Sequence, residues 1–509
     1  MALASGTLSI RREAARSQWA QEYTRGVKTI RTWVVRLAGA ALLVAVTLIV
    51  GGAVDARHRH PDLKPWHQLI PNDLAAAEMD DAFTFEQWVT REAEVFAEVE
   101  ALEGRLPKDE HTPVNRYAAG SRTHPSRLGR DWNRTFEMEP PEPRGGVVLV
   151  HGLTDSPYSM RPLAQLLHDE GFYTLALRMP GHGTVPAGLI DATWEDWLAA
   201  VRVGMRHARQ KVGADRPLLL VGYSNGGALA VMYAAAALDR PQDPRPAKLL
   251  LLSPMIGVTP AARLAWWISR LGVVPYFEKA RWLDVLPEYN PVKYNSFPAN
   301  AGFQTASLTA ALQATIVRLA DRGRLSALPP ILTFQSAVDA TVSTAAIVQA
   351  LYDRLPANGS ELVLFDVNHQ SGIEAFVKPD DLTLVDRLFE GTERAYRRTL
   401  ITNRSPDTVA VVARTLQQGQ TASADQELGL SWPQGFFSLT HIAVPFPPDD
   451  PLYGTDSVED GSGLFRLGRL SPRGERAVLI AGADTLTRLA SNPFFPYLAE
   501  RVRQWATTP

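Results

Sequence analysis

The sequence predicts an α/β fold, in which a mostly parallel sheet is flanked by helices, and two observations lead to this prediction. From residue 145 onward, short apolar segments alternate with amphipathic helical segments, as in parallel sheets that are covered on both faces. Several of the apolar segments end in a polar or glycine-containing turn, where open α/β sheets bind their ligands. The predicted strands are residues 146–150, 174–177, 217–221, 248–252, 330–335 and 361–367.

Composition excludes several classes of function. The chain has 509 residues, a formal net charge of −2 and no cysteine. A nearly neutral chain has no basic field for nucleic acid, and without cysteine it has neither disulfides nor thiolate ligands. No HExxH pattern, EF-hand loop or Walker motif is present, so we expect no metal, nucleotide or other cofactor.

The first predicted element is a membrane anchor. Residues 37–54 carry no charge and are nearly long enough to cross a bilayer. Seven Lys or Arg residues but only two Glu residues lie within residues 1–36, so the positive-inside rule predicts a cytoplasmic basic leader. The rest of the chain is then periplasmic or otherwise extracytoplasmic. A cleaved signal peptide and a buried core helix are the alternatives, but the run is longer than most signal segments and apolar all round.

Residues 55–104 form a juxtamembrane and acidic segment. Between Asp73 and Glu103 there are ten acidic residues, and Arg91 is the one basic residue. Apolar residues recur there at helical spacing, which predicts a helix that packs one face on the domain and exposes an acidic face. The alternative is an acidic docking surface.

The strongest chemical signal is a serine between a strand and a helix. The predicted strand 217–221 leads into Gly222-Tyr-Ser224-Asn-Gly226, and an alanine-rich helical segment, 228–237, follows. A serine in so sharp a turn exposes its hydroxyl, and the glycines let the neighbouring backbone approach closely. This pattern predicts that Ser224 is a nucleophile.

A second turn follows the strand 146–150 and begins with His151-Gly152-Leu153. It is expected to present a backbone N–H, so that Leu153 and Asn225 together supply the two donors of an oxyanion hole. We interpret His151 as a brace for this turn, and His182, in a later glycine-rich turn, as structural too.

Three stretches in this order, HGLTDSPYSMR, RMPGHG and GYSNGG, resemble the α/β-hydrolases of the monoacylglycerol lipase and serine-aminopeptidase-like group. The resemblance covers about residues 145–355. It implies the α/β-hydrolase fold, with residues 105–509 as the hydrolase domain, and a triad in the chain order serine, acid, histidine. The family places its acid at the turn after the strand 330–335, which makes Asp339 the expected acid. The alternative is that Asp339 only caps the next helix.

Two histidines follow Asp339, and the sequence leaves both open. His369 comes 30 residues later, after the strand 361–367, as in a compact family pattern. His441 follows residues 435–440, which resemble another strand, and precedes residues 494–505, which resemble the closing helix of the fold. We favour His441 and keep His369 as the alternative. On this interpretation residues 368–430 are an insertion, with a strand at 398–402 and a helix at 406–416.

Residues 254–329 occupy the place of the lid in these hydrolases and are rich in aromatic residues. They would cover an apolar acyl chain or pack on the domain as a helical cap. The aromatic residues are Trp266, Trp267, Tyr276, Phe277, Trp282 and Tyr289.

Together these features predict a membrane-anchored serine hydrolase that cleaves small or lipid-like acyl esters through a Ser-Asp-His triad and an acyl-enzyme. A thioesterase, an amidase or aminopeptidase, and an acyltransferase are alternatives on the same fold, because the triad does not fix the leaving group. A binding module without catalytic activity is the alternative of another class.

Overall fold

A computed structural model of the chain describes residues 5–257, 267–339, 341–372, 377, 379–390, 392–456, 461, 463–469 and 488–508. The chain divides into two compact units. The first consists of residues 1–60 and 267–281, and the second of residues 61–266 and 282–509.

The second unit is built on a sheet that has ten strands in the described part of the chain, in the order β1-β3-β2-β4-β5-β8-β9-β10-β11-β12. Neighbouring strands from β3 to β10 are parallel, and β1, β11 and β12 are antiparallel to their neighbours. The strands are β1 (Phe136–Met138), β2 (Gly146–Val150), β3 (Tyr173–Leu177), β4 (Leu218–Tyr223), β5 (Lys248–Leu252), β8 (Ile331–Ser336), β9 (Glu361–Phe365), β10 (Arg397–Asn403), β11 (Ala410–Leu416) and β12 (Ala424–Ser431). The six predicted strands are confirmed as β2, β3, β4, β5, β8 and β9.

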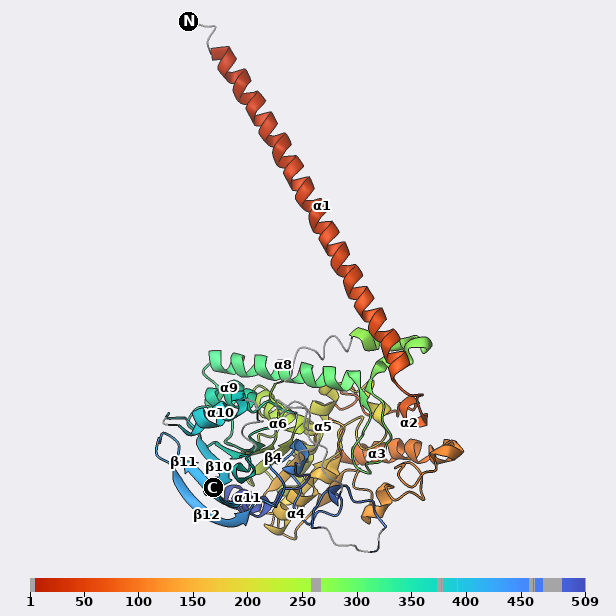
Figure 1. The fold of residues 1–509 in the computed structure, drawn as a ribbon, viewed down its shortest axis with the longest axis vertical. Helices are drawn as coiled ribbons and strands as arrows, with labels where there is room; N and C mark the ends of the chain where they lie inside the picture. Colours follow the sequence, from red (N-terminus) through yellow and green to blue (C-terminus); the bar gives the residue numbers. More distant parts are fainter. Residues whose placement is uncertain are drawn as a thin grey trace. The chain divides into compact units, whose positions relative to one another are not determined.

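Helices cover both faces of this sheet (Figure 1). On one face, Val148 and Leu220 pack with Trp197 of α5 and Leu229 of α6. On the other face, their neighbours in the strands pack with α4 and α11. Because both faces are buried, the central strands are apolar along their whole length, as is typical of parallel sheets. The helices of this unit are α2 (Pro65–Gln68), α3 (Phe85–Glu100), α4 (Arg161–Asp169), α5 (Trp194–Val212), α6 (Asn225–Ala236), α8 (Ala299–Asp321), α9 (Thr344–Ala350), α10 (Pro379–Phe389) and α11 (Phe495–Thr507).

The acidic segment contributes one helix, α3, over part of the predicted range. Thr84 caps it, because its side chain accepts a hydrogen bond from the Gln87 N–H. Trp88, Val95 and Phe96 are buried on its inner face, so the predicted packing of one face is confirmed.

The C-terminal region differs from two of the predictions. Residues 406–416, predicted as a helix, contain the strand β11, which lies between β10 and the edge strand β12 and pairs antiparallel with both (Figure 1). Two factors favour the strand: Val411, Val412 and Thr415 are β-branched, and the edge of β10 offers backbone hydrogen-bonding groups. Residues 435–440, predicted as a strand, form a loop in which Leu439 makes a single bridge to Leu489. The closing helix is confirmed as α11.

The segment interpreted as a lid is divided between the two units. Residues 258–266, which include the aromatic Trp266, lie outside the described residues. Residues 267–281 belong to the first unit and form the short 3-10 helices η6 (Leu271–Val273) and η7 (Pro275–Arg281). The rest forms a small hairpin, β6 (Trp282–Asp284) with β7 (Phe297–Pro298), and the helix α8 in the second unit.

The first unit contains the long helix α1 (Ser5–Arg59). Its segment Arg31–Arg59 contains an 18-residue window with a mean hydropathy of 2.4 and is long enough to cross a membrane. This property rests on length and composition, and a signal sequence has it as well.

Candidate active site

Ser224 lies in the sharp turn between β4 and α6. Its φ is 54°, a left-handed conformation that a residue with a side chain adopts at a cost of roughly 1–3 kcal/mol. A Cβ atom at position 222 would collide with the carbonyl oxygen of Gly226, and one at position 226 with that of Val150. The two glycines are therefore required for the close packing that holds Ser224 in the turn.

The turn after β2 lies directly against Ser224. A Cβ atom added to Gly152 would be 3.1 Å from the Cβ of Ser224, which places Leu153, the next residue, beside the serine. Asn225 is the first residue of α6, so its N–H belongs to the helix N-terminus, where the helix dipole favours negative charge. The structure thus brings Leu153 and Asn225, the two predicted oxyanion donors, to the neighbourhood of Ser224.

His151 holds this turn through both of its ring nitrogens. Its Nδ1 lies 2.8 Å from the carbonyl oxygen of Gly152, and its Nε2 accepts a hydrogen bond of 3.0 Å from the N–H of Met179. An Nε2 that accepts must be unprotonated, so the ring is neutral and Nδ1 donates. Burial also lowers the pKa of His151 well below its usual value. These contacts stabilise the turn, which is the structural role predicted for His151.

His182 lies beside His151, with 5.1 Å between the ring centroids. Its Nδ1 is 3.1 Å from the carbonyl oxygen of Pro180, and burial lowers its pKa to about 4. A buried histidine that is neutral at pH 7 and bonded to the backbone of its own turn has a structural role, as predicted for His182.

Asp339 and His441 form a buried pair at the carboxyl end of β8. His441 Nδ1 lies 2.8 Å from Asp339 Oδ2, while Asp339 Oδ1 accepts hydrogen bonds from the backbone N–H groups of Thr341 and Val342. Burial raises the pKa of the Asp339 carboxyl, but the charge and hydrogen bond of His441 outweigh this effect and hold the pKa below its usual value. The carboxylate is therefore ionised and orients the imidazole.

The His441 ring also stacks on Tyr223, the residue before Ser224. The two ring centroids are 5.3 Å apart and the ring planes differ by 26°. The Tyr223 hydroxyl donates a 3.3 Å hydrogen bond to the His441 carbonyl oxygen. These contacts bring the Asp339–His441 pair to the turn that carries Ser224.

His369 pairs with a different acid. Its Nε2 lies 2.9 Å from Asp366 Oδ2, and the same oxygen accepts a hydrogen bond from the Thr402 hydroxyl. The pair lines a polar cavity of about 640 Å³, beside Glu390 and Arg414. The structure does not bring His369 to Asp339.

Two buried arginines were not identified from the sequence. Arg178, at the end of β3, contacts both Asp73 and Glu92, and Arg488 contacts the loops that carry Asp339 and His441. Arg178 is the first residue of the RMPGHG stretch, but nothing in the local pattern shows that either arginine is buried, because their partners lie far away in the sequence.

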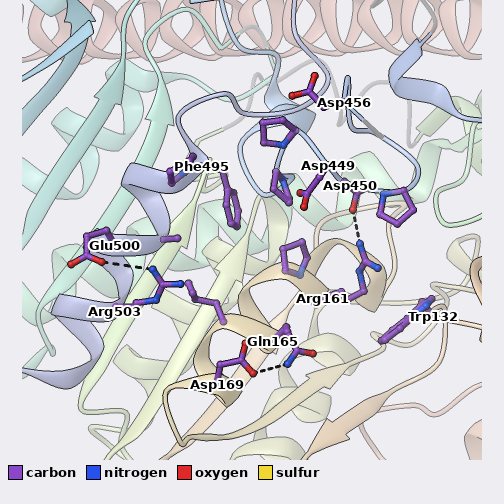
Figure 2. Close-up of a pocket in the computed structure, with 17 residues that line it drawn as sticks. Trp132, Arg161, Gln165, Asp169, Asp449, Asp450, Asp456, Phe495, Glu500 and Arg503 are labelled. Carbon is purple, nitrogen blue, oxygen red and sulfur yellow. Dashed lines mark hydrogen bonds and ion pairs between the residues drawn. The ribbon is translucent and has the colours of Figure 1, made fainter. Parts of the chain in front are cut away.

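A larger cavity lies elsewhere in the second unit. It measures about 970 Å³ and is bordered by α4, α11 and the loop 447–456 (Figure 2). Arg161 crosses it to pair with Asp450 at 2.8 Å. Neither Ser224, Asp339 nor His441 lines this cavity, so it is separate from the catalytic candidates.

Comparisons with known proteins find similarity in the central part of the chain. The family described as "Serine aminopeptidase, S33" matches residues 141–369, a range that contains Ser224 and Asp339 and ends at His369. The chain is 27% identical over 175 residues to a thermostable monoacylglycerol lipase of Bacillus sp. (strain H-257). That match covers 34% of this chain and 65% of the length of the lipase.

Solved structures with a similar arrangement include a monoacylglycerol lipase from Paleococcus ferrophilus, 18% identical, with a TM-score of 0.35. It matches over 46% of this chain and 88% of that chain. A structure reported with the metagenome-derived lipolytic enzymes LipS and LipT is 24% identical, with a TM-score of 0.36. It matches over 46% of this chain and 87% of that chain.

Proposed function

We propose that the chain is a lipase- and esterase-like α/β-hydrolase, and that it cleaves carboxylic acyl esters through the triad Ser224, Asp339 and His441. Its similarity to a serine aminopeptidase family and to a monoacylglycerol lipase supports this proposal. The observation that carries this proposal is the buried Asp339–His441 pair, 2.8 Å apart, whose imidazole stacks beside the Ser224 turn.

In the proposed reaction, Ser224 Oγ attacks the ester carbonyl while His441 Nε2 takes its proton. Asp339 holds the imidazole with Nδ1 protonated and stabilises the charge that forms on it. The N–H groups of Leu153 and Asn225 receive the negative charge that develops on the carbonyl oxygen. His441 then gives the proton to the leaving alcohol. In the second half, it activates the water that hydrolyses the acyl-enzyme.

We also propose that α1 anchors the enzyme as a single membrane span. Its apolar segment is long enough to cross a bilayer, and the excess of basic residues before it favours a cytoplasmic N-terminus. The second unit, which carries the proposed triad and which we call the hydrolase unit, would then face the periplasm or another extracytoplasmic compartment.

We expect the purified full chain in detergent to hydrolyse p-nitrophenyl esters and to react with a fluorophosphonate probe at Ser224, because the proposed triad activates that hydroxyl. Mass spectrometry of the labelled peptide identifies the serine, and a Ser224→Ala variant is the control. Faster hydrolysis of an aminoacyl p-nitroanilide or an acyl thioester would move the enzyme to the aminopeptidases or thioesterases. No labelling of Ser224 at high probe concentration would overturn the proposal.

A further inference from the structure

The first unit joins the end of the apolar helix to residues 267–281, which we call the platform (Figure 1). Ala53 and Ala56 of α1 form a small apolar cluster with Ala280, and Ile268, Leu271 and Phe277 pack against it. A Cβ atom on Gly52 would be 2.7 Å from Cδ1 of Ile268, so the two segments are in close contact. The contact lies at the last residues of the uncharged run 37–54.

The platform carries large apolar side chains on its outer surface. The exposed fractions are 68% for Val273, 49% for Val274, 56% for Trp267 and 54% for Tyr276. A group of exposed apolar side chains this dense marks a surface that contacts another apolar phase or molecule. Trp and Tyr are also the residues enriched where a protein crosses from the hydrocarbon to the headgroups of a bilayer.

The charge of the platform is suited to the same environment. Residues 267–281 contain Arg270, Lys279 and Arg281 against the single acid Glu278. The last turns of α1 add Arg57, whose guanidinium lies 4.0 Å over the Tyr276 ring and donates to the Tyr276 carbonyl oxygen. Basic residues beside an apolar surface attract anionic headgroups.

From this combination we propose that the platform rests in the interface of the bilayer that α1 spans, as a second membrane contact next to the anchor. The proposal depends on the proposed membrane span of α1. Because the helix rises 1.5 Å per residue, a segment packed on residues 52–56 lies at the outer end of the apolar run, where the hydrocarbon meets the headgroups. Val273 and Val274 would enter the acyl boundary, and the basic residues would face phosphates.

The absence of cysteine allows a direct measurement of depth. Single variants Val273→Cys, Leu43→Cys and Val89→Cys in the full chain are labelled with a nitroxide and reconstituted in nanodiscs of phosphatidylethanolamine and phosphatidylglycerol. The accessibility of the nitroxide to oxygen indicates a position in the lipid, and its accessibility to a water-soluble nickel chelate indicates a position in water. Leu43 is at mid-span, while Val89, 49% exposed on α3, is the control on the hydrolase unit.

We expect the label at position 273 to be protected from nickel and accessible to oxygen, at a depth between positions 43 and 89. A label at position 273 that is as accessible to nickel as the one at position 89, with position 43 protected, overturns the platform and leaves the anchor standing. If position 43 is also accessible to nickel, the anchor and the platform both fail.

A different observation assigns a role to Arg488 in the second unit. Its side chain is buried, and one terminal nitrogen donates to the carbonyl oxygens of Val338, at 2.9 Å, and Leu439, at 2.7 Å. Its Nε donates to the Ser438 hydroxyl at 2.7 Å. Val338 precedes Asp339, and Leu439 is two residues before His441. One guanidinium therefore ties together the loops of the proposed acid and base.

We infer that Arg488 is a positioning residue, which holds Asp339 and His441 in register for proton transfer without touching the substrate. The inference depends on the proposed triad. Hydrogen bonds in a fixed fork suit this task, because a lysine at the same position could not reach the three acceptors with the same geometry. A small misplacement of the pair is enough to cost about 100-fold in rate.

The test compares Arg488→Met and Arg488→Lys with Arg501→Met, once wild-type ester hydrolysis has been established. Arg501 is a matched control, because it is a partly buried arginine that binds Glu361 at the opposite end of the sheet. For Arg488→Met we expect kcat to fall about 100-fold with KM within about threefold, and the pH profile of kcat/KM to shift. Arg488→Lys should recover part of kcat.

Equal losses of kcat in Arg488→Met and Arg501→Met, at equal thermal stability, would overturn the positioning role and leave a structural one. An unchanged kcat and pH profile in Arg488→Met would overturn it as well. If the wild type itself has no esterase activity, the proposed function has failed, which is a separate result.

Discussion

Replacing His441 by alanine should lower kcat for p-nitrophenyl ester hydrolysis by about 10³-fold or more, as should replacing Ser224, because the proposed nucleophile and base act as one unit. Replacing His369 by alanine should leave kcat within about threefold, because its imidazole binds Asp366, whereas the imidazole that binds Asp339 is that of His441. Steady-state rates of the three variants in detergent provide the measurement.

The double variant sharpens this experiment. When two residues act as a unit, removing the first already removes the contribution of both to the rate. The double variant Ser224→Ala/His441→Ala should therefore be about as slow as either single variant. The matched control is His369→Ala, which removes an imidazole that, like that of His441, pairs with an aspartate. If His369→Ala is the inactive variant and His441→Ala keeps its rate, the triad is the compact one and the proposed role of His441 is wrong.

The two histidines show what a sequence can and cannot predict here. Both follow apolar segments and both have an acid within reach, so local pattern does not separate them. The tertiary structure distinguishes the two histidines. After β9 the chain adds β10, β11 and β12 to the sheet, and the loop that follows β12 then brings His441 back to the Ser224 turn. Such a return depends on contacts between distant residues, which periodicity does not encode.

The parallel strands, by contrast, were predictable to within two residues. Each is a short run of apolar residues that ends in a turn, because both faces of a parallel sheet are buried. At the edge of the sheet this rule weakens. The segment that contains β11 mixes buried and partly buried residues and was predicted as a helix, although its valines and its pairing with β10 favour a strand.

The largest effect on stability is expected at Arg178. Its side chain is fully buried and contacts Asp73 at 2.7 Å and Glu92 at 3.0 Å. Burial raises the pKa of the Asp73 carboxyl, but Arg178 outweighs this and holds the pKa below its usual value. Replacing Arg178 by methionine leaves two carboxylates buried without their cation, which should lower the free energy of unfolding by about 3–5 kcal/mol.

Denaturant unfolding followed by tryptophan fluorescence measures this loss. Arg404→Met is the control, because Arg404 pairs with Glu427 at the surface and such pairs contribute about 0–1 kcal/mol. Adding Asp73→Asn and Glu92→Gln to Arg178→Met should recover part of the stability, since neutral amides cost less to bury than unpaired carboxylates. A loss below about 1 kcal/mol in Arg178→Met would contradict this account.

The result bears on the domain boundary as well as on stability. Asp73 also accepts the backbone N–H of Gly181, and Arg178 donates to the carbonyl oxygen of His182, so residues before position 105 contact the loop that lies against His151. A chain that begins at residue 105 would lack both carboxylates and Trp88 of the core, and should therefore be less stable than Arg178→Met itself. The acidic segment then acts as part of the hydrolase unit, since it neutralises the arginine on which that loop depends.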